Sequence, residues 1–225
     1  MEDKKAPLET FKVNHTTLYA IGPPGGDVCL YFSLSGEDSL TTPPFCNPAQ
    51  ILANKGFRVI SATLPNHENN QRPMNIRDLW GDSPENLERF FFAMEQVIDQ
   101  LNCPIIALGL SRGAFIATHL AARCQTIHTV IGYAPLTHLE KAPHLDLIHL
   151  KEAVKEKHLH YFIGHNDTLV ETSRVIQTVS EFMSSLTAKQ LREAAITLTL
   201  SPSIGRDGHG TSDQTFAKGI SWICS

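Results

Sequence analysis

Ser111, Asp167 and His209 belong to residue types that cooperate in nucleophilic catalysis, although they lie far apart in the chain. A serine hydroxyl is a poor nucleophile at neutral pH, so it needs a base that accepts its proton. Histidine serves as this base when a carboxylate orients its ring and stabilises the protonated form. We therefore predict that Ser111 attacks a carbonyl carbon, that His209 accepts its proton, and that Asp167 orients His209.

The assignment of Ser111 rests on its surroundings, the sequence Gly-Leu-Ser-Arg-Gly at 109–113. A Gly-x-Ser-x-Gly pattern arises by chance in roughly one chain in ten of this length, so alone it is weak. Here it follows the apolar run 104–110 and precedes 114–121, where small and apolar residues recur at helical spacing. A strand, a sharp turn and a helix are the context in which a strained serine is presented above a sheet. The alternative is that Ser111 only caps the helix beginning at Arg112.

The acid and the base each follow a later apolar run. Asp167 lies in the turn Gly-His-Asn-Asp-Thr-Leu-Val at 164–170, and His209 lies in the glycine-flanked stretch Asp-Gly-His-Gly at 207–210. Ligands bind at the carboxyl ends of the strands in open α/β sheets. We therefore expect both residues to lie near Ser111.

Other interpretations of these polar residues stay open. Asp167 could cap the helix that follows it, and Asp207 could serve as the acid, although it is only two residues from His209. His158 and His160 share one face of a predicted strand, as a metal-binding pair would. No clear third ligand accompanies them, so we expect no metal site.

These residues would be positioned by an alternation of strands and helices. Six short apolar runs, most of them nearly continuous rather than alternating, are typical of strands buried on both faces of a parallel sheet. The runs are 28–34, 58–64, 104–110, 129–133, 158–163 and 195–200.

The helices between the runs have recognisable starts and faces. Ser83, Pro84 and Glu85 combine an N-cap, a first-turn proline and a first-turn acid, and apolar residues then recur every three or four positions to Leu101. A similar pattern extends from 175 to 186, and a last helix is predicted over 214–223. The fold class is therefore α/β, with a doubly wound, mostly parallel sheet of about six or more strands flanked by helices. We expect one domain over residues 1–225.

Composition excludes several classes of function. The 225 residues carry a net charge of −4 with scattered Lys and Arg, so no basic surface for nucleic acid is expected. No apolar stretch approaches the length of a membrane span, and the charged start is unlike a secretory signal. The five cysteines are odd in number and widely spaced, which favours free thiols in a reducing cytoplasm.

Two long segments fit neither the strand nor the helix pattern, 65–82 and 135–157. Both follow predicted strands, and loops of this length in a compact domain are usually functional or carry short helices. We interpret them as loop or cap segments that wall a substrate pocket. Trp80, Tyr133 and Leu136 are the candidate pocket residues, although core packing would explain the aromatic side chains equally well.

These motifs together resemble the α/β-hydrolase superfamily, and within it the prolyl-oligopeptidase-like and dienelactone-hydrolase-like branch of serine hydrolases. The resemblance runs roughly from Val28 to the C-terminus and is carried by 109–113, 133–136, 164–170 and 208–210. In that fold the chain order is serine, then acid, then histidine, as here. The resemblance implies a hydrolase that needs no cofactor.

The resemblance also implies an oxyanion hole, a set of backbone N–H groups that stabilise the negative oxygen formed during the reaction. Arg112 is expected to supply one N–H group, because it begins the helix after Ser111. The second is expected from Leu34 or Ser35, where relatives often carry a His-Gly pair that this chain lacks. The Arg112 guanidinium could bind a substrate carboxylate, the 65–82 loop or a neighbouring acid.

The predicted activity is cleavage of a small-molecule ester or thioester through an acyl-enzyme intermediate. One alternative is an inactive binding protein that keeps the fold, since fold alone does not imply function. A peptidase of the prolyl-oligopeptidase type is a further alternative, although the chain has no room for the large propeller of those enzymes. Lyase or haloperoxidase chemistry would use the same residues. The oligomeric state is left open.

Overall fold

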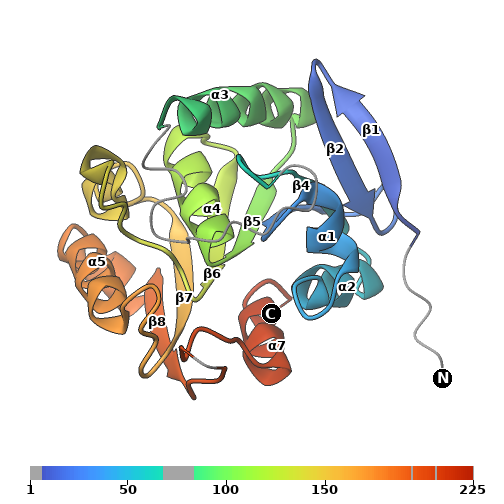
Figure 1. The fold of residues 1–225 in the computed structure, drawn as a ribbon. Helices are drawn as coiled ribbons and strands as arrows, with labels where there is room; N and C mark the ends of the chain where they lie inside the picture. Colours follow the sequence, from blue (N-terminus) through green and yellow to red (C-terminus); the bar gives the residue numbers. More distant parts are fainter. Residues whose placement is uncertain (1–6, 68–83, 194, 206, 225) are drawn as a thin grey trace.

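The computed structural model describes residues 7–67, 84–193, 195–205 and 207–224. Its centre is an eight-stranded sheet with the strand order β1-β2-β4-β3-β5-β6-β7-β8 (Figure 1). The strands are β1 (Glu9–Val13), β2 (Thr16–Ile21), β3 (Val28–Phe32), β4 (Arg58–Ala62), β5 (Ile105–Leu110), β6 (Ile127–Tyr133), β7 (His158–Gly164) and β8 (Ile196–Ser201).

Strands β3 to β8 are parallel to one another and correspond to the six predicted apolar runs, with ends that differ by a few residues. The predicted doubly wound, mostly parallel sheet is therefore confirmed. The antiparallel hairpin of β1 and β2, which pairs with β4, was not predicted. Its strands are short, and β1 is mostly exposed, so it has no apolar run to reveal it.

Helices cover both faces of the sheet (Figure 1). One face packs against α1 (Gly36–Thr41), α2 (Asn47–Asn54) and α7 (Asp213–Ser221), and the other against α3 (Pro84–Leu101), α4 (Arg112–Arg123) and α5 (Thr172–Ser184). The short helix α6 (Ala188–Arg192) has no buried residue. No helix within the described ranges is both long enough and apolar enough to cross a membrane.

The core is divided by the sheet into two clusters of buried apolar residues. The larger cluster contains Phe91, Phe115 and Phe182 from the helices α3, α4 and α5. The smaller one contains Tyr31 and Tyr133 from the central strands, packed against helices α2 and α7. A central strand buried on both faces gives a rigid support for the loops at its carboxyl end. The turns after β5, β7 and β8 carry Ser111, Asp167 and His209.

Candidate active site

Ser111 occupies the turn between β5 and α4 in a strained backbone conformation, with φ 56° and ψ −114°. Few residues other than glycine adopt a positive φ, and such strain is found mostly at functional sites. The predicted strand, sharp turn and helix are therefore present. The Ser111 side chain makes no capping hydrogen bond to the helix, so capping does not explain the residue.

The two glycines of the motif allow the turn to be this tight. A Cβ atom on Gly113 would lie 1.8 Å from the carbonyl oxygen of Phe32, and one on Gly109 would lie 2.1 Å from the backbone of Gly113. Real Cβ atoms do not approach other atoms so closely. Strand β3, strand β5 and helix α4 therefore come together at Ser111 only because both positions lack a side chain.

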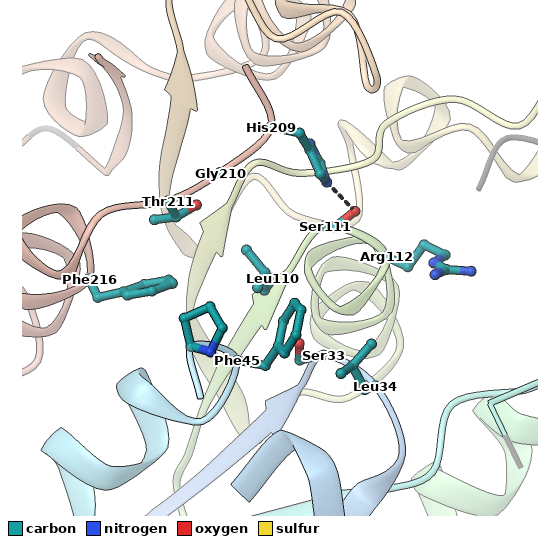
Figure 2. A pocket seen from close by; sticks show the side chains of 11 residues that line it. Ser33, Leu34, Phe45, Leu110, Ser111, Arg112, His209, Gly210, Thr211 and Phe216 are labelled. Carbon is teal, nitrogen blue, oxygen red and sulfur yellow. Dashed lines mark hydrogen bonds between the residues drawn. The ribbon is translucent and has the colours of Figure 1, made fainter. Parts of the chain in front are cut away.

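His209 comes from the loop between β8 and α7 and lies next to Ser111. Its Nε2 atom is 2.9 Å from the Ser111 Oγ atom, a hydrogen bond drawn in Figure 2. The preceding Gly208 has a φ of 70°, and a Cβ there would lie 2.1 Å from the carbonyl oxygen of Asn166. The glycine thus lets the His209 loop pack directly on the turn that carries Asp167.

Asp167 completes a continuous chain of hydrogen bonds. Its side chain is fully buried, and its Oδ2 atom accepts a hydrogen bond from His209 Nδ1 at 2.7 Å. Its Oδ1 atom accepts the backbone N–H groups of Leu169 at 2.9 Å and Val170 at 3.1 Å. Since three donors hold this carboxylate, its position is set before any substrate arrives. With Nδ1 donating to Asp167, the His209 Nε2 atom is left to accept the Ser111 proton.

The alternative acid, Asp207, occupies a different position. Asp207 is exposed, and its backbone carbonyl accepts hydrogen bonds from the N–H and hydroxyl of Thr168. It therefore ties the His209 loop to the turn after β7, whereas the carboxylate that contacts His209 belongs to Asp167.

The loop between β3 and α1 is organised by Ser39, a residue that the sequence analysis missed. The fully buried Ser39 Oγ accepts the N–H groups of Ser33 at 3.2 Å and Leu34 at 2.9 Å, and donates to the Ser35 carbonyl at 2.8 Å. The Ser35 N–H makes no hydrogen bond to any of the described residues. The Leu34 N–H therefore already has an acceptor, whereas the Ser35 N–H has none within the described parts of the chain.

A pocket of about 270 Å³ opens beside Ser111 (Figure 2). Among the described residues, its lining consists of the short segments 33–34, 44–45, 110–112 and 209–211 together with Phe216 of helix α7. The segment 44–45 connects α1 with α2 and follows β3, the strand beside β5. The sequence signal that could have found it is the turn-rich Thr-Thr-Pro-Pro-Phe at 41–45, which follows the first core strand.

The predicted pocket residues are placed differently. Tyr133 is fully buried in the core, and its hydroxyl donates to the Phe216 carbonyl at 2.9 Å, so it supports the pocket from below. Leu136 is buried and faces a separate small hollow, while its N–H donates to the Ser111 carbonyl. No described residue of 135–157 lines the pocket beside Ser111. Trp80 and most of 65–82 lie outside the described residues.

The residue after Ser111, Arg112, carries a charge that is largely buried. Burial lowers the pKa of Arg112 to about 10, which still leaves it charged at neutral pH. The neighbouring His67 is also buried, and burial, together with the Arg112 charge, lowers the pKa of His67 to about 4. His67 is therefore neutral near pH 7, and Arg112 is the cationic residue adjoining Ser111.

The histidine pair considered as a metal site lies at the opposite edge of the sheet, where β7 begins. His160 is buried, hydrogen-bonded through Nδ1 to Thr197 Oγ1 at 2.9 Å, and stacked on Trp222 with ring centroids 4.1 Å apart. His158 is exposed. Within the described parts of the chain, no group of three or more histidine, cysteine or acidic residues is placed to hold a metal ion.

The chain was compared with known protein families, sequences and structures, and similar folds were found among the structures. No family model and no curated protein sequence matches this chain. Among solved structures, a protein from Thermus thermophilus has a TM-score of 0.77 at 16% identity, and the similarity covers 98% of this chain and 97% of that one. An esterase from Pyrococcus furiosus has a TM-score of 0.65 at 12% identity, covering 96% and 90%. Dienelactone hydrolase from Anabaena variabilis has a TM-score of 0.63 at 16% identity, covering 97% and 96%.

The chain has the α/β-hydrolase fold. In each of these three comparisons the similarity covers at least 90% of both chains. Identities of 12 to 16% carry the fold and leave the activity to be argued from the residues of the site.

Proposed function

We propose that this α/β-hydrolase is a serine hydrolase that cleaves an ester or thioester bond of a small molecule. The observation that carries the proposal is the hydrogen-bonded chain from Asp167 through His209 to the strained Ser111, at the mouth of a pocket. A protein that only bound ligands would have no physical need for this ordered chain. The esterases among the structural neighbours add support at the level of fold.

In the proposed reaction, His209 Nε2 takes the hydroxyl proton as Ser111 Oγ attacks the carbonyl carbon of the substrate. The tetrahedral intermediate collapses when the leaving alcohol or thiol receives that proton from His209, and the acyl group stays on Ser111. Water then attacks the acyl-enzyme with His209 again as the base. Asp167 keeps Nδ1 protonated throughout and stabilises the imidazolium form of His209.

We assign the oxyanion to the N–H groups of Arg112 and Ser35. Arg112 is the first residue of helix α4, so its backbone N–H lies at the N-terminus of the helix, directly after Ser111. The positive end of the helix dipole reinforces this N–H group. Of the two candidates for the second donor, Leu34 already donates to Ser39 Oγ, so Ser35 is the better choice.

Labelling with a fluorophosphonate, followed by peptide mass spectrometry, tests the nucleophile directly. We expect one adduct on Ser111, together with turnover of p-nitrophenyl butyrate. The variant Ser111→Ala should lose the adduct and reduce kcat by about 10⁴-fold or more, while its thermal unfolding stays like that of the parent. An unlabelled parent protein without turnover on any ester or thioester would contradict the proposal and favour a binding role.

A further inference from the structure

The pocket beside Ser111 is lined mostly by apolar side chains. The side chains that shape it away from the reacting atoms are carbon-rich, and the largest come from Leu34, Pro44, Phe45, Leu110 and Phe216. In Figure 2 the labelled members of this set, Leu34, Phe45, Leu110 and Phe216, lie on the side of the pocket away from His209, with Phe45 beside Leu110. Such a surface binds apolar groups, because removing them from water is favourable and the walls offer few hydrogen-bond partners.

The charges around the pocket also favour the binding of a neutral, apolar group. Among the described residues that line the pocket, none is acidic, and Arg112 is the one with a permanent charge. The Arg112 side chain points away from Phe216 and Leu110 in Figure 2, so its guanidinium does not face that part of the apolar wall. A charged group placed against those walls would lose its hydration without gaining a partner, which is unfavourable.

The size of the pocket limits the group that it can hold. Its volume is about 270 Å³. Since one water takes about 30 Å³ in the liquid, the pocket has room for about nine non-hydrogen atoms. An unbranched acyl group of about four to eight carbons would fill this space without leaving a large void.

Two buried tyrosines fix the aromatic walls. The Tyr31 hydroxyl, from β3, donates to the Phe45 carbonyl at 2.5 Å, and the Tyr133 hydroxyl, from β6, donates to the Phe216 carbonyl at 2.9 Å. Both tyrosines are fully buried, and burial raises the pKa of each hydroxyl, so each remains a donor. The rigid central sheet therefore sets where both phenylalanines stand.

We propose that this pocket takes the acyl part of the substrate, that the acyl group is neutral and apolar with about four to eight carbons, and that Phe45 sets its length. Phe45 is chosen over Phe216 because it is partly exposed on a loop, whereas Phe216 is almost fully buried and packs edge-on against Tyr133. Tyr31 acts as a positioning residue for Phe45. The proposal rests on the proposed hydrolase function.

The first test is a series of p-nitrophenyl esters from acetate to decanoate. We expect kcat/KM of the parent protein to peak between butyrate and octanoate. Phe45→Ala should raise the ratio of decanoate to butyrate kcat/KM at least about tenfold, and Phe45→Trp should lower it, since each methylene in an apolar pocket is worth about tenfold or more. Phe92→Ala is the matched control, because Phe92 is 64% exposed on helix α3 and does not line the pocket.

The second test compares p-nitrophenyl hexanoate with p-nitrophenyl hydrogen adipate, whose acyl chain has the same length but ends in a carboxylate. We expect kcat/KM for the adipate to be at least about 100-fold lower, because the carboxylate would be buried without a partner. Equal or faster hydrolysis of the adipate would overturn the neutral, apolar assignment.

Tyr31→Phe tests the positioning role, because it removes only one hydroxyl. We expect a broader chain-length profile, with the preference among butyrate, hexanoate and octanoate reduced at least about threefold. A change in thermal stability with an unchanged profile would mean that the Tyr31 hydroxyl is only structural.

These outcomes are separable from failure of the proposed function. If the parent protein labels at Ser111 and hydrolyses esters but Phe45→Ala and Phe45→Trp keep the parent profile, the acyl pocket is wrong and the hydrolase stands. If the parent neither labels nor turns over, the hydrolase proposal fails first. Phe45→Leu provides a smaller change should Phe45→Ala not fold.

Discussion

The Nδ1 atom of His209 lies 2.7 Å from the Oδ2 atom of Asp167, a carboxylate with no exposed side-chain surface that is 42 residues away in the chain. The same carboxylate is held by two backbone N–H groups of its own turn. This geometry makes the orientation of the His209 ring a property of the folded protein rather than of the substrate complex. It also distinguishes Asp167 from Asp207, which lies only two residues from His209 in the sequence.

Asp167→Asn should reduce kcat by about 10³- to 10⁴-fold, because an amide favours the wrong tautomer of His209. Asp207→Asn is the matched control and should change kcat less than about threefold, since the Asp207 side chain is exposed and its contact with Thr168 is made by the backbone. The measurement is steady-state hydrolysis of p-nitrophenyl butyrate. Similar losses in both variants would argue against Asp167 as the orienting acid.

Ser39→Ala should lower both stability and kcat. The variant leaves the buried N–H of Ser33 and the partly buried N–H of Leu34 without their acceptor, which destabilises the protein by about 1–3 kcal/mol. The loop that carries the Ser35 N–H then loses its support, so we expect kcat to fall by about tenfold with little change in KM.

Thr41→Ala is the control for Ser39→Ala. Thr41 lies in the same helix as Ser39, and its hydroxyl donates a hydrogen bond to the Glu37 carbonyl at the surface. Urea unfolding measures the stability change, and ester kinetics measure kcat and KM. An unchanged kcat in a destabilised Ser39→Ala protein would restrict Ser39 to a structural role.

Gly113→Ala should prevent the turn at Ser111 from forming as it does in the native protein. The added Cβ would overlap the Phe32 carbonyl oxygen, so strand β3 and helix α4 must separate, and we expect a destabilisation of about 3 kcal/mol or more. Gly25→Ala provides the comparison, because a Cβ there would meet no atom within 4 Å. Thermal unfolding and fluorophosphonate labelling would report the two effects, and a labelled, stable Gly113→Ala protein would contradict the packing argument.

His119 should make folding stability depend on pH between about 6.5 and 4. His119 is buried between Phe91 and Phe115 with Nε2 donating to the Leu145 carbonyl, and burial lowers its pKa from 6.5 to about 4. In that range the unfolded chain binds a proton that the folded chain does not. The contribution is therefore complete above pH 6.5 and is lost as the pH falls toward 4, by about 3 kcal/mol.

Urea unfolding of the parent protein and of His119→Gln from pH 7 to pH 4 would measure this dependence. Glutamine keeps an N–H donor for the Leu145 carbonyl and does not titrate, so the variant should show a shallower loss of stability at low pH. Parallel curves for the two proteins would mean that His119 is not the group responsible.

Much of this protein follows from local patterns in the chain. The six parallel strands β3 to β8 are visible as apolar runs because strands covered on both faces need nearly continuous apolar residues. The turn at Ser111 is visible because only glycines tolerate such close backbone approach. Once parallel strands are predicted, Asp167 and His209 follow from their places after β7 and β8, because these ends share one edge of the sheet.

The residues that line the pocket could not be predicted from local patterns in the sequence. Phe45 and Phe216 lie 171 positions apart in the chain. The backbone carbonyl of each accepts a hydrogen bond from the hydroxyl of a tyrosine, and the two tyrosines belong to different strands. Tyr133 was predicted to line the pocket. A large aromatic residue at the end of a strand gives the same sequence pattern whether its side chain lines a cavity or packs beneath it. Ser39 carries no motif, and its three hydrogen bonds exist only when the loop before it folds back.

The sequence by itself therefore determined where the parallel strands lie along the chain and which residues could be the nucleophile, base and acid, because periodicity and glycine placement are local properties. The tertiary structure decided which acid contacts His209, which loop amide has no acceptor among the described residues, and which side chains line the pocket. Those outcomes depend on how distant segments pack against one another, and no local pattern records that packing.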